Sequence, residues 1–220
     1  MAPVGVPALL MLASCLLFIL PSCLYACPRS CSCPSPKEVH CTFRHLPSVP
    51  RNLPQDTKRL NLGYNKLKRV DPSLFEGLTS LVRLHLDHNL IDFIEPFSFN
   101  GLTSLKLLQL EGNKLQDLHS HTFITVSVLG TFWSSGLRHL HLADNQLEYL
   151  LPRTLQRLDR LEVLSLHGNP WACDCHLRWL LEWDKNHEGE TSFIVFSNLC
   201  TTHSELYVMA LNKIQLHTNI

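Results

Sequence analysis

One pattern recurs along the middle of this 220-residue chain and limits the folds that it can adopt. Leucines stand at fixed spacing around an asparagine, in the form Leu-x-x-Leu-x-Leu-x-x-Asn-x-Leu, with small departures in the first and last copies. The asparagines are Asn65, Asn89, Asn113, Asn145 and Asn169, at spacings of 24, 24, 32 and 24 residues. Such a period indicates a repeat architecture, here five similar units with one insertion of eight residues.

The leucine spacing predicts the local structure of each unit. In Leu-x-Leu, successive side chains point to opposite faces of a strand, so the leucines enter the core and the x residues point outward. One unit cannot bury its apolar edge alone, and stacked neighbours close a continuous core. The sequence therefore predicts an α/β leucine-rich-repeat solenoid with a parallel β-sheet on its concave side. Each asparagine amide is expected to pair with turn backbone groups that would otherwise be buried without partners.

The second half of each unit repeats as well and is expected to complete the core. Its apolar positions are Val70, Phe75 and Leu78, then Ile94, Phe99 and Leu102, then Leu118, Phe123 and Val126, and finally Leu150, Leu155 and Leu158.

The first 26 residues are unlike the repeats. They carry no charged side chain and run apolar from Pro7 to Leu20, which predicts a secretory signal peptide cleaved after Ala26. A membrane-spanning helix is the alternative, but Pro21 breaks the run, and the same proline fits poorly into a lipoprotein cleavage box. Seven of the nine cysteines remain after cleavage, in a chain headed for an oxidising compartment where disulfides persist. Because seven is odd, at least one cysteine is left without an intramolecular partner.

Cysteines flank the repeats, where a solenoid needs caps over its exposed core. We expect a cysteine-rich N-terminal cap over residues 27–56, five repeats over 57–170, an incomplete C-terminal cap over 171–200, and a poorly ordered tail over 201–220. The apolar residues expected to close the caps are Val39, Leu46 and Val49 at one end and Leu177, Leu180 and Leu181, at helical spacing, at the other. Trp179 or Trp183 is expected at the margin of that helix.

Several motifs occur in order along the chain: Glu38-Val39-His40-Cys41, Asn61-Leu62-Gly63-Tyr64-Asn65, Leu84-His85-Leu86-Asp87-His88-Asn89 and Leu110-Glu111-Gly112-Asn113. Together with the flanking cysteines, they resemble the repeat head of the adlican family, which comprises matrix-remodelling-associated proteins and immunoglobulin-superfamily relatives, over residues 27–183. The resemblance implies an extracellular or matrix protein whose repeats would be followed by immunoglobulin domains. It also implies disulfides Cys27–Cys33 and Cys31–Cys41.

The C-terminal part departs from that family. No immunoglobulin-like strand pattern follows the repeats, and only Cys200 lies beyond Cys173 and Cys175, where the family's cap supplies two further cysteines. We therefore expect a truncated, alternatively spliced or mis-predicted end, in which Cys200 pairs with Cys173 or alternatively with Cys175. The short apolar run Phe193 to Phe196 cannot anchor the chain in a membrane.

Outward positions of the predicted strands are the candidate binding residues of the concave face. They are Arg59, Arg83, His85, Asp87, Gln109, Glu111, His139 and His141. Their charges are mixed, whereas a glycosaminoglycan site needs a basic stripe of a single sign. Lys58, Arg59, Lys66, Lys68 and Arg69 form a local basic cluster, whose simpler interpretation is a solvated repeat edge. The insertion around residues 130–136, with Phe132 and Trp133, either forms a second contact surface or packs on the convex side.

Other function classes fit less well. The chain has 19 basic and 19 acidic residues, so it lacks the basic excess that nucleic-acid binding requires. No Gly-x-Ser-x-Gly, His-Glu-x-x-His or phosphate-binding glycine loop is present, so an enzyme is not expected. No metal or cofactor is expected either, because His85 and His88 lie two repeats from His139 and His141, at roughly 5 Å per repeat.

The sequence thus favours a secreted leucine-rich-repeat module of the extracellular matrix or cell surface that binds a protein or matrix ligand through its concave face. A truncated structural fragment or isoform without ligand binding of its own is the main alternative, and a glycosaminoglycan binder is the second.

Overall fold

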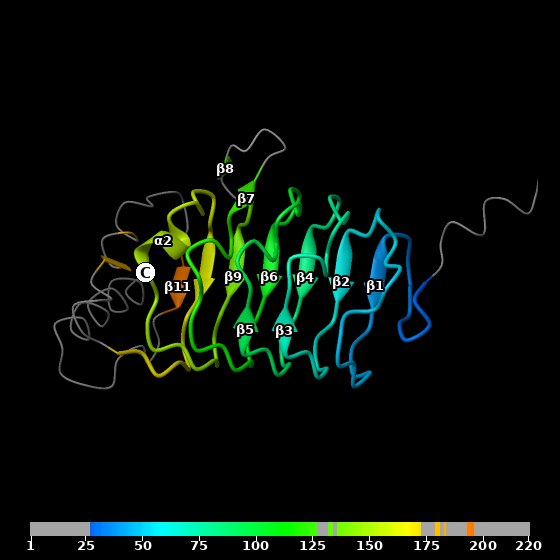
Figure 1. The fold of residues 1–220 in the computed structure, drawn as a ribbon, viewed down its shortest axis with the longest axis horizontal. Coiled ribbons are helices and arrows are strands. Elements are labelled where there is room, and N and C mark those ends of the chain that lie inside the picture. The colour runs from blue at the N-terminus through cyan, green and yellow to red at the C-terminus, as the bar shows by residue number, and fades with distance from the viewer. Residues whose placement is uncertain are drawn as a thin grey trace, which may run out of the picture.

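The computed structural model describes residues 27–126, 132–133, 136–172, 179–180, 183 and 193–195. Over this range the chain forms a solenoid in which successive turns lie side by side, from the N-terminal cap to the last repeat (Figure 1). The predicted signal peptide, the predicted tail and the cysteines Cys173, Cys175 and Cys200 lie outside the described residues.

One parallel sheet extends along the whole solenoid. Its seven strands lie in the order β1 (Glu38–His40), β2 (Arg59–Asn61), β4 (Arg83–His85), β6 (Leu107–Gln109), β9 (His139–His141), β10 (Val163–Ser165) and β11 (Phe193–Val195). Neighbouring strands pair residue for residue, so the central leucines Leu60, Leu84, Leu108, Leu140 and Leu164 stand in one row. This arrangement confirms the predicted α/β leucine-rich-repeat solenoid.

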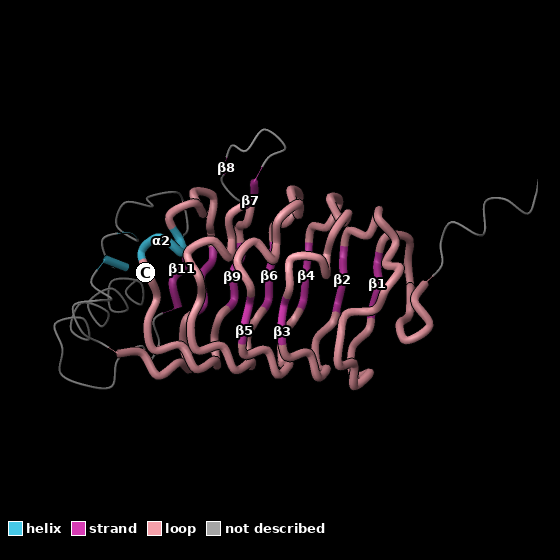
Figure 2. Tube along the Cα trace, in the orientation of Figure 1, coloured by secondary structure: helices cyan, strands magenta, loops and turns pink. Residues whose placement is uncertain are grey.

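The rest of each turn is mostly loop, and the strands are short segments within it (Figure 2). β3 (Arg69–Val70) and β5 (Phe93–Ile94) form a second, two-stranded parallel sheet. The helix α2 (Pro152–Leu155) follows the fourth repeat's asparagine turn, and Pro152 occupies its first turn, where a missing N–H costs nothing. At the predicted insertion, β7 (Thr125–Val126) and β8 (Phe132–Trp133) form an antiparallel pair.

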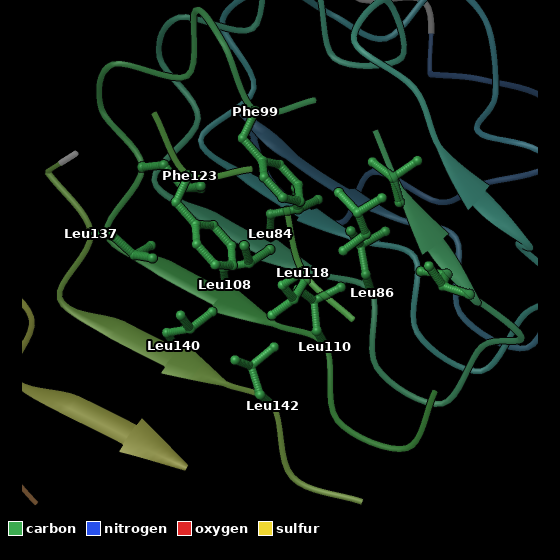
Figure 3. Packing of buried hydrophobic residues seen from close by; sticks show 14 of the residues in the cluster. Leu84, Leu86, Phe99, Leu108, Leu110, Leu118, Phe123, Leu137, Leu140 and Leu142 are labelled. Carbon is green, nitrogen blue, oxygen red and sulfur yellow. The ribbon is translucent and has the colours of Figure 1, made fainter. Parts of the chain in front are cut away.

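The leucines of the repeat pattern form one continuous core, as the spacing predicts. Leu84, Leu108 and Leu140 are fully buried, and Figure 3 shows Leu84 and Leu108 near the rings of Phe99 and Phe123 from the second halves of their turns. There the rings of Phe75, Phe99 and Phe123 stack along the solenoid, with centroids 6.3 and 6.1 Å apart. Each repeat therefore contributes one layer of leucines and, in three repeats, one phenylalanine ring to a core shared with its neighbours.

The asparagines connect each repeat to the one before it. The Asn113 side-chain amide donates to the carbonyls of Leu86, in the preceding repeat, and Leu110, at 3.0 and 2.9 Å. Its Oδ1 accepts from the backbone N–H of Ile91 at 3.1 Å. Asn65, Asn89, Asn145 and Asn169 are also buried and make the same kinds of bonds. The asparagine amide thus satisfies turn backbone groups, and it does so across the boundary between repeats.

The N-terminal cap closes one end of this core. Disulfides join Cys27 to Cys33 and Cys31 to Cys41, the same pairs that the family resemblance implies. Val39 and Val49 are buried, and β1 extends the main sheet by pairing with β2. Backbone bonds between Ser32 and His40 cover the outer edge of β1, which leaves that edge less open to pairing with another chain.

Aromatic residues close part of the opposite end. The indole N–H of Trp171 donates to the carbonyl of Leu166 at 2.8 Å, and that of Trp179 donates to Leu150 at 3.0 Å. Leu180 is buried against the core, and Trp179 and Trp183 are partly buried there. Leu177 and Leu181, the other two residues of the predicted cap helix, lie outside the described residues. β11 lies within residues 171–200, which the sequence analysis expects to form an incomplete C-terminal cap, and it adds a strand beside β10.

Candidate binding surface on the open face of the sheet

The register of the strands arranges the outward side chains in rows that cross the repeats. Row one contains Arg59, Arg83, Leu107, His139 and Val163, and row two contains Asn61, His85, Gln109, His141 and Ser165. β1 extends the rows with Glu38 and His40, which the sequence analysis assigned only to the cap. The apolar Val39 between these two polar residues is the signal that indicates another strand of the same type. Six of the eight candidate residues therefore share one surface, namely Arg59, Arg83, His85, Gln109, His139 and His141. We call this surface, together with row three below, the sheet face.

Among the described residues, row one contains one cation without an ion-pair partner, Arg83, and it lies between charged residues that are paired. The Arg59 guanidinium forms an ion pair with Glu38 of the cap. At the other end, Glu162 forms an ion pair with Arg138 and lies 3.7 Å from the His139 imidazole. Arg83 is exposed and forms no ion pair with any other described residue. The charge that row one offers to a ligand is thus concentrated at Arg83.

Row two carries two half-buried imidazoles on either side of Gln109. Burial is the main cause that lowers the pKa of His85, and the nearby Asp87 carboxylate partly offsets it. Burial also lowers the pKa of His141, followed by the effect of His139. The His141 Nδ1 lies 3.1 Å from the Ser165 hydroxyl oxygen. Both imidazoles therefore favour the neutral form, in which each ring has one donor and one acceptor nitrogen.

Row three lies two residues beyond the ends of the strands and contains Gly63, Asp87, Glu111, Ala143 and His167. Asp87 and Glu111, which the sequence analysis placed on the strands, therefore lie in the turns that follow them, because each strand ends at the row-two residue. The Gln109 amide donates to Glu111 Oε1 at 2.7 Å, while Glu111 Oε2 is buried and has no hydrogen-bond partner among the described residues. Burial raises the pKa of Glu111, and the Asp87 carboxylate adds to the rise. The Asp87 carboxylate lies over Gly63, where an added Cβ would meet both of its oxygens at 2.9 Å. A side chain at position 63 would therefore displace Asp87.

Replacing Glu111 with glutamine is expected to stabilise the folded chain at pH 7. A raised folded-state pKa means that the folded state binds the proton more tightly than the unfolded chain, so the ionised form costs stability at neutral pH. The gain should reach about 1 kcal/mol at most, because solvent screens a half-exposed carboxylate. Urea unfolding at pH 7 and pH 4 measures it. The gain should shrink at pH 4, below the ordinary glutamate pKa of 4.5, and the exposed Glu76→Gln control should show none.

The lowered pKa of His141 gives the opposite pH dependence. Its neutral form stabilises the folded state above the ordinary histidine pKa of 6.5, and this contribution is lost as pH falls below that value because the unfolded chain takes up the proton first. We expect the parent chain to lose more stability between pH 7.5 and pH 5 than a His141→Gln variant does. The difference should be about 1 kcal/mol or less, measured by urea unfolding at both pH values. Equal losses in the two proteins would contradict the assignment.

A fourth row of turn residues, which the sequence analysis did not single out, borders row three. It contains Phe43, Tyr64, His88, Gly112, Asp144 and Gly168, and all six have positive φ angles. The rings of Phe43, Tyr64 and His88 stack, with successive centroids 4.4 Å apart. Phe43 is 67% exposed and Tyr64 41% exposed, so this stack lies at the surface. The sequence signal is the residue directly before the repeat asparagine, as in Tyr64-Asn65 and His88-Asn89.

The predicted basic cluster is divided in the structure. Lys58 directly precedes β2, whereas Lys66 and Lys68 follow it, beyond the asparagine turn. Arg59 is paired with Glu38. Arg69 lies 3.0 Å from Glu95, with its guanidinium 5.0 Å from the centre of the Phe93 ring. Residues that are neighbours in sequence are thus separated by the strand, and two of the five cations are already paired within the protein.

Metal binding was not expected, and the described residues offer no group of three or more histidine, cysteine or acidic side chains that could hold an ion. His85 and His141 stand on β4 and β9, which are separated by β6. The backbone of the insertion forms the β7–β8 pair, but the side chains of Phe132 and Trp133 lie outside what the structure describes. The described part of the chain also contains no helix with the length and apolarity that crossing a membrane requires.

Comparison with known proteins agrees with this architecture. One model of the leucine rich repeat family matches residues 42–91 and 79–130, and a second model of the same repeat matches residues 136–158. Immunoglobulin superfamily member 10 of Rattus norvegicus is 41% identical over 226 aligned positions, covering 81% of this chain and 9% of that protein. Matrix-remodeling-associated protein 5 of Homo sapiens is 40% identical, covering 79% of this chain and 8% of that protein.

A solved structure gives the same result for the fold. The structure of TLR13 in complex with ssRNA13 superposes with a TM-score of 0.55 at 29% sequence identity, covering 64% of this chain and 19% of that one. The chain spans less than a tenth of the length of the two relatives named above. The family models match residues 42–130 and 136–158, so the similarity that they show concerns the repeat region.

Proposed function

Because this chain belongs to the leucine-rich-repeat family, we propose that it is an extracellular module that binds a protein or matrix ligand through its sheet face. One observation carries the proposal. Six strands align their outward side chains in two rows that are polar except for Leu107 and Val163 in row one, and the buried apolar residues between the rows hold the backbone in a rigid register. A preformed surface keeps the ordering cost of binding low, which favours recognition of a folded ligand.

An extracellular location is supported by three features. The N-terminal cap contains two disulfides, which persist in oxidising compartments. The relatives include a matrix-remodeling-associated protein and a member of the immunoglobulin superfamily. We propose that the chain is secreted and acts in the extracellular space or matrix, as the apolar segment before Cys27 also suggests.

The charge of the sheet face favours a protein over a polyanionic glycan. Among the described residues, Arg83 is the row-one cation without an ion-pair partner, and row three holds the carboxyl groups Asp87 and Glu111. A glycosaminoglycan would meet these carboxylates with repulsion, whereas a protein surface of mixed charge can match both signs.

Photo-crosslinking tests which surface meets the ligand. A photoreactive amino acid placed at Arg83, on the sheet face, should crosslink proteins from conditioned medium of matrix-producing cells, and mass spectrometry identifies them. The same amino acid at Glu76, an exposed position that follows β3 outside the main sheet, is the matched control. We expect specific products at position 83 and none at position 76. Products at position 76 alone would contradict binding through the sheet face.

A further inference from the structure

The residues directly before the strands of the main sheet form a further row along the solenoid. From the second member on, each donates its backbone N–H to the carbonyl of the equivalent residue one turn earlier, at 2.7 to 2.9 Å. The row therefore contains one residue of each successive turn, and we call it the edge row. Its members are Lys37, Lys58, Val82, Lys106, Arg138 and Glu162.

Exposed cations fill most of the edge row. Lys37, Lys58, Lys106 and Arg138 occupy four of its first five positions. Because neighbouring strands lie roughly 5 Å apart, these cations extend over about 20 Å along the solenoid. Their residue numbers run from 37 to 138, so no basic segment of the sequence indicates the row. The fold collects them into one stripe, because each turn contributes one residue to it.

The lysines of the stripe keep their charge available to a partner. Arg138 pairs with Glu162, the acidic residue at the end of the row, and Glu38 beside Lys37 pairs with Arg59 of row one. Over the part of the chain that the structure describes, none of the three lysines forms an ion pair. The chain as a whole has 19 basic and 19 acidic residues, so this excess of positive charge is local.

The carboxylates that disfavour a glycan on the sheet face lie at the other ends of the strands. Asp87 follows Val82 by five residues, and Glu111 follows Lys106 by five. At the rise of an extended chain, five residues place these carboxylates roughly 15 Å from the edge row. This distance is nearly twice the Debye length of about 8 Å at physiological ionic strength. Repulsion from row three therefore hardly reaches a polyanion on the edge row.

We propose that the edge row binds a sulfated glycosaminoglycan, whose successive anionic groups meet Lys37, Lys58 and Lys106. A linear polyanion can meet a cation on several turns of the solenoid at once, whereas a small anion meets only one or two. A stripe of a single sign also concentrates its electrostatic field along the direction in which such a chain extends. The edge row lies outside the sheet face, so the proposal does not depend on protein binding there.

A defined heparin hexasaccharide, fluorescently labelled, is the probe. We expect saturable binding to the secreted full chain by fluorescence polarisation, with an affinity that falls at least about tenfold between about 0.05 M and about 0.5 M NaCl. The triple variant Lys37→Gln, Lys58→Gln, Lys106→Gln should bind about tenfold more weakly or worse. The matched control is Lys66→Gln, Lys68→Gln, Lys114→Gln, which removes three exposed lysines beyond the asparagine turns and should stay within about twofold of the parent. Because both variants lose the same charge, only the position of the lysines differs.

Two further probes identify the chemistry that is recognised. The N-acetylheparosan hexasaccharide has the carboxylates but no sulfates, and a glutamate peptide of equal charge represents an acidic protein segment. Both should bind at least about tenfold more weakly than heparin, the peptide because its flexible chain loses more freedom on binding.

Three results would overturn the inference: no saturable binding of heparin, an equal loss of affinity in the two triple variants, or glutamate-peptide binding as tight as that of heparin. Thermal unfolding of both variants shows whether the fold is intact, and all six lysines are exposed.

Discussion

Replacing Phe99 with alanine is expected to reduce the free energy of unfolding by about 3 to 5 kcal/mol. The Phe99 ring is 4% exposed and lies between Phe75 and Phe123, so its removal leaves a cavity in the middle of the stacked phenylalanines. The neighbouring repeats cannot collapse into that space, because the sheet register holds each turn in place. Urea unfolding followed by circular dichroism measures the change.

Phe43→Ala is the matched control for this prediction. It removes the same ring, but from a position that is 67% exposed, so no cavity forms and the change should stay below about 0.5 kcal/mol. A loss at Phe43 as large as that at Phe99 would mean that the exposed stack, and not the buried one, supports the fold.

Replacing Asn113 with alanine is expected to cost about 3 kcal/mol although it removes no large apolar side chain. The change leaves the N–H of Ile91 buried without its acceptor, and it removes one donor from the carbonyls of Leu86 and Leu110. A buried backbone donor without a partner costs roughly 1–3 kcal/mol, and the lost bonds to the carbonyls add to this. Urea unfolding of the variant gives the value.

The control for Asn113 is Gln146→Ala, a polar residue that follows the next repeat asparagine but points to solvent. It should change the free energy of unfolding by less than about 0.5 kcal/mol. An equally small change in the free energy of unfolding for Asn113→Ala would mean that water replaces Asn113 as the hydrogen-bond partner of the turn backbone groups. The asparagine bonds between repeats would then not stabilise the solenoid.

The core could be predicted almost residue by residue, because apolar side chains recur at fixed spacing in both halves of each repeat. Leu84, Leu108 and Phe99 are buried where that spacing places them. The rows of the sheet face could be predicted because alternate residues of a strand point to the same face of the sheet. When equivalent strands pair in register, these outward residues line up across the repeats.

Features that depend on contacts between distant residues could not be predicted. The stack of Phe43, Tyr64 and His88 joins the cap to two repeats, and its members share only the turn geometry before an asparagine or its equivalent in the cap. β11 pairs with β10 although its segment carries no repeat pattern. The basic cluster looked continuous in sequence, but the strand β2 divides it and Glu38 and Glu95 pair with two of its members.

The central claim is that the sheet face is the binding surface, and affinity measured on two matched variants tests it most directly. One variant replaces Arg83, His85, His139 and His141 with alanine, and the other replaces the exposed Glu76, Lys114, Gln116 and Arg157, which lie outside the main sheet. With the crosslinked ligand immobilised, we expect the first to bind at least about 100-fold more weakly than the parent, and the second to bind like the parent. Equal affinity of the first variant and the parent, with both folded, would contradict the claim.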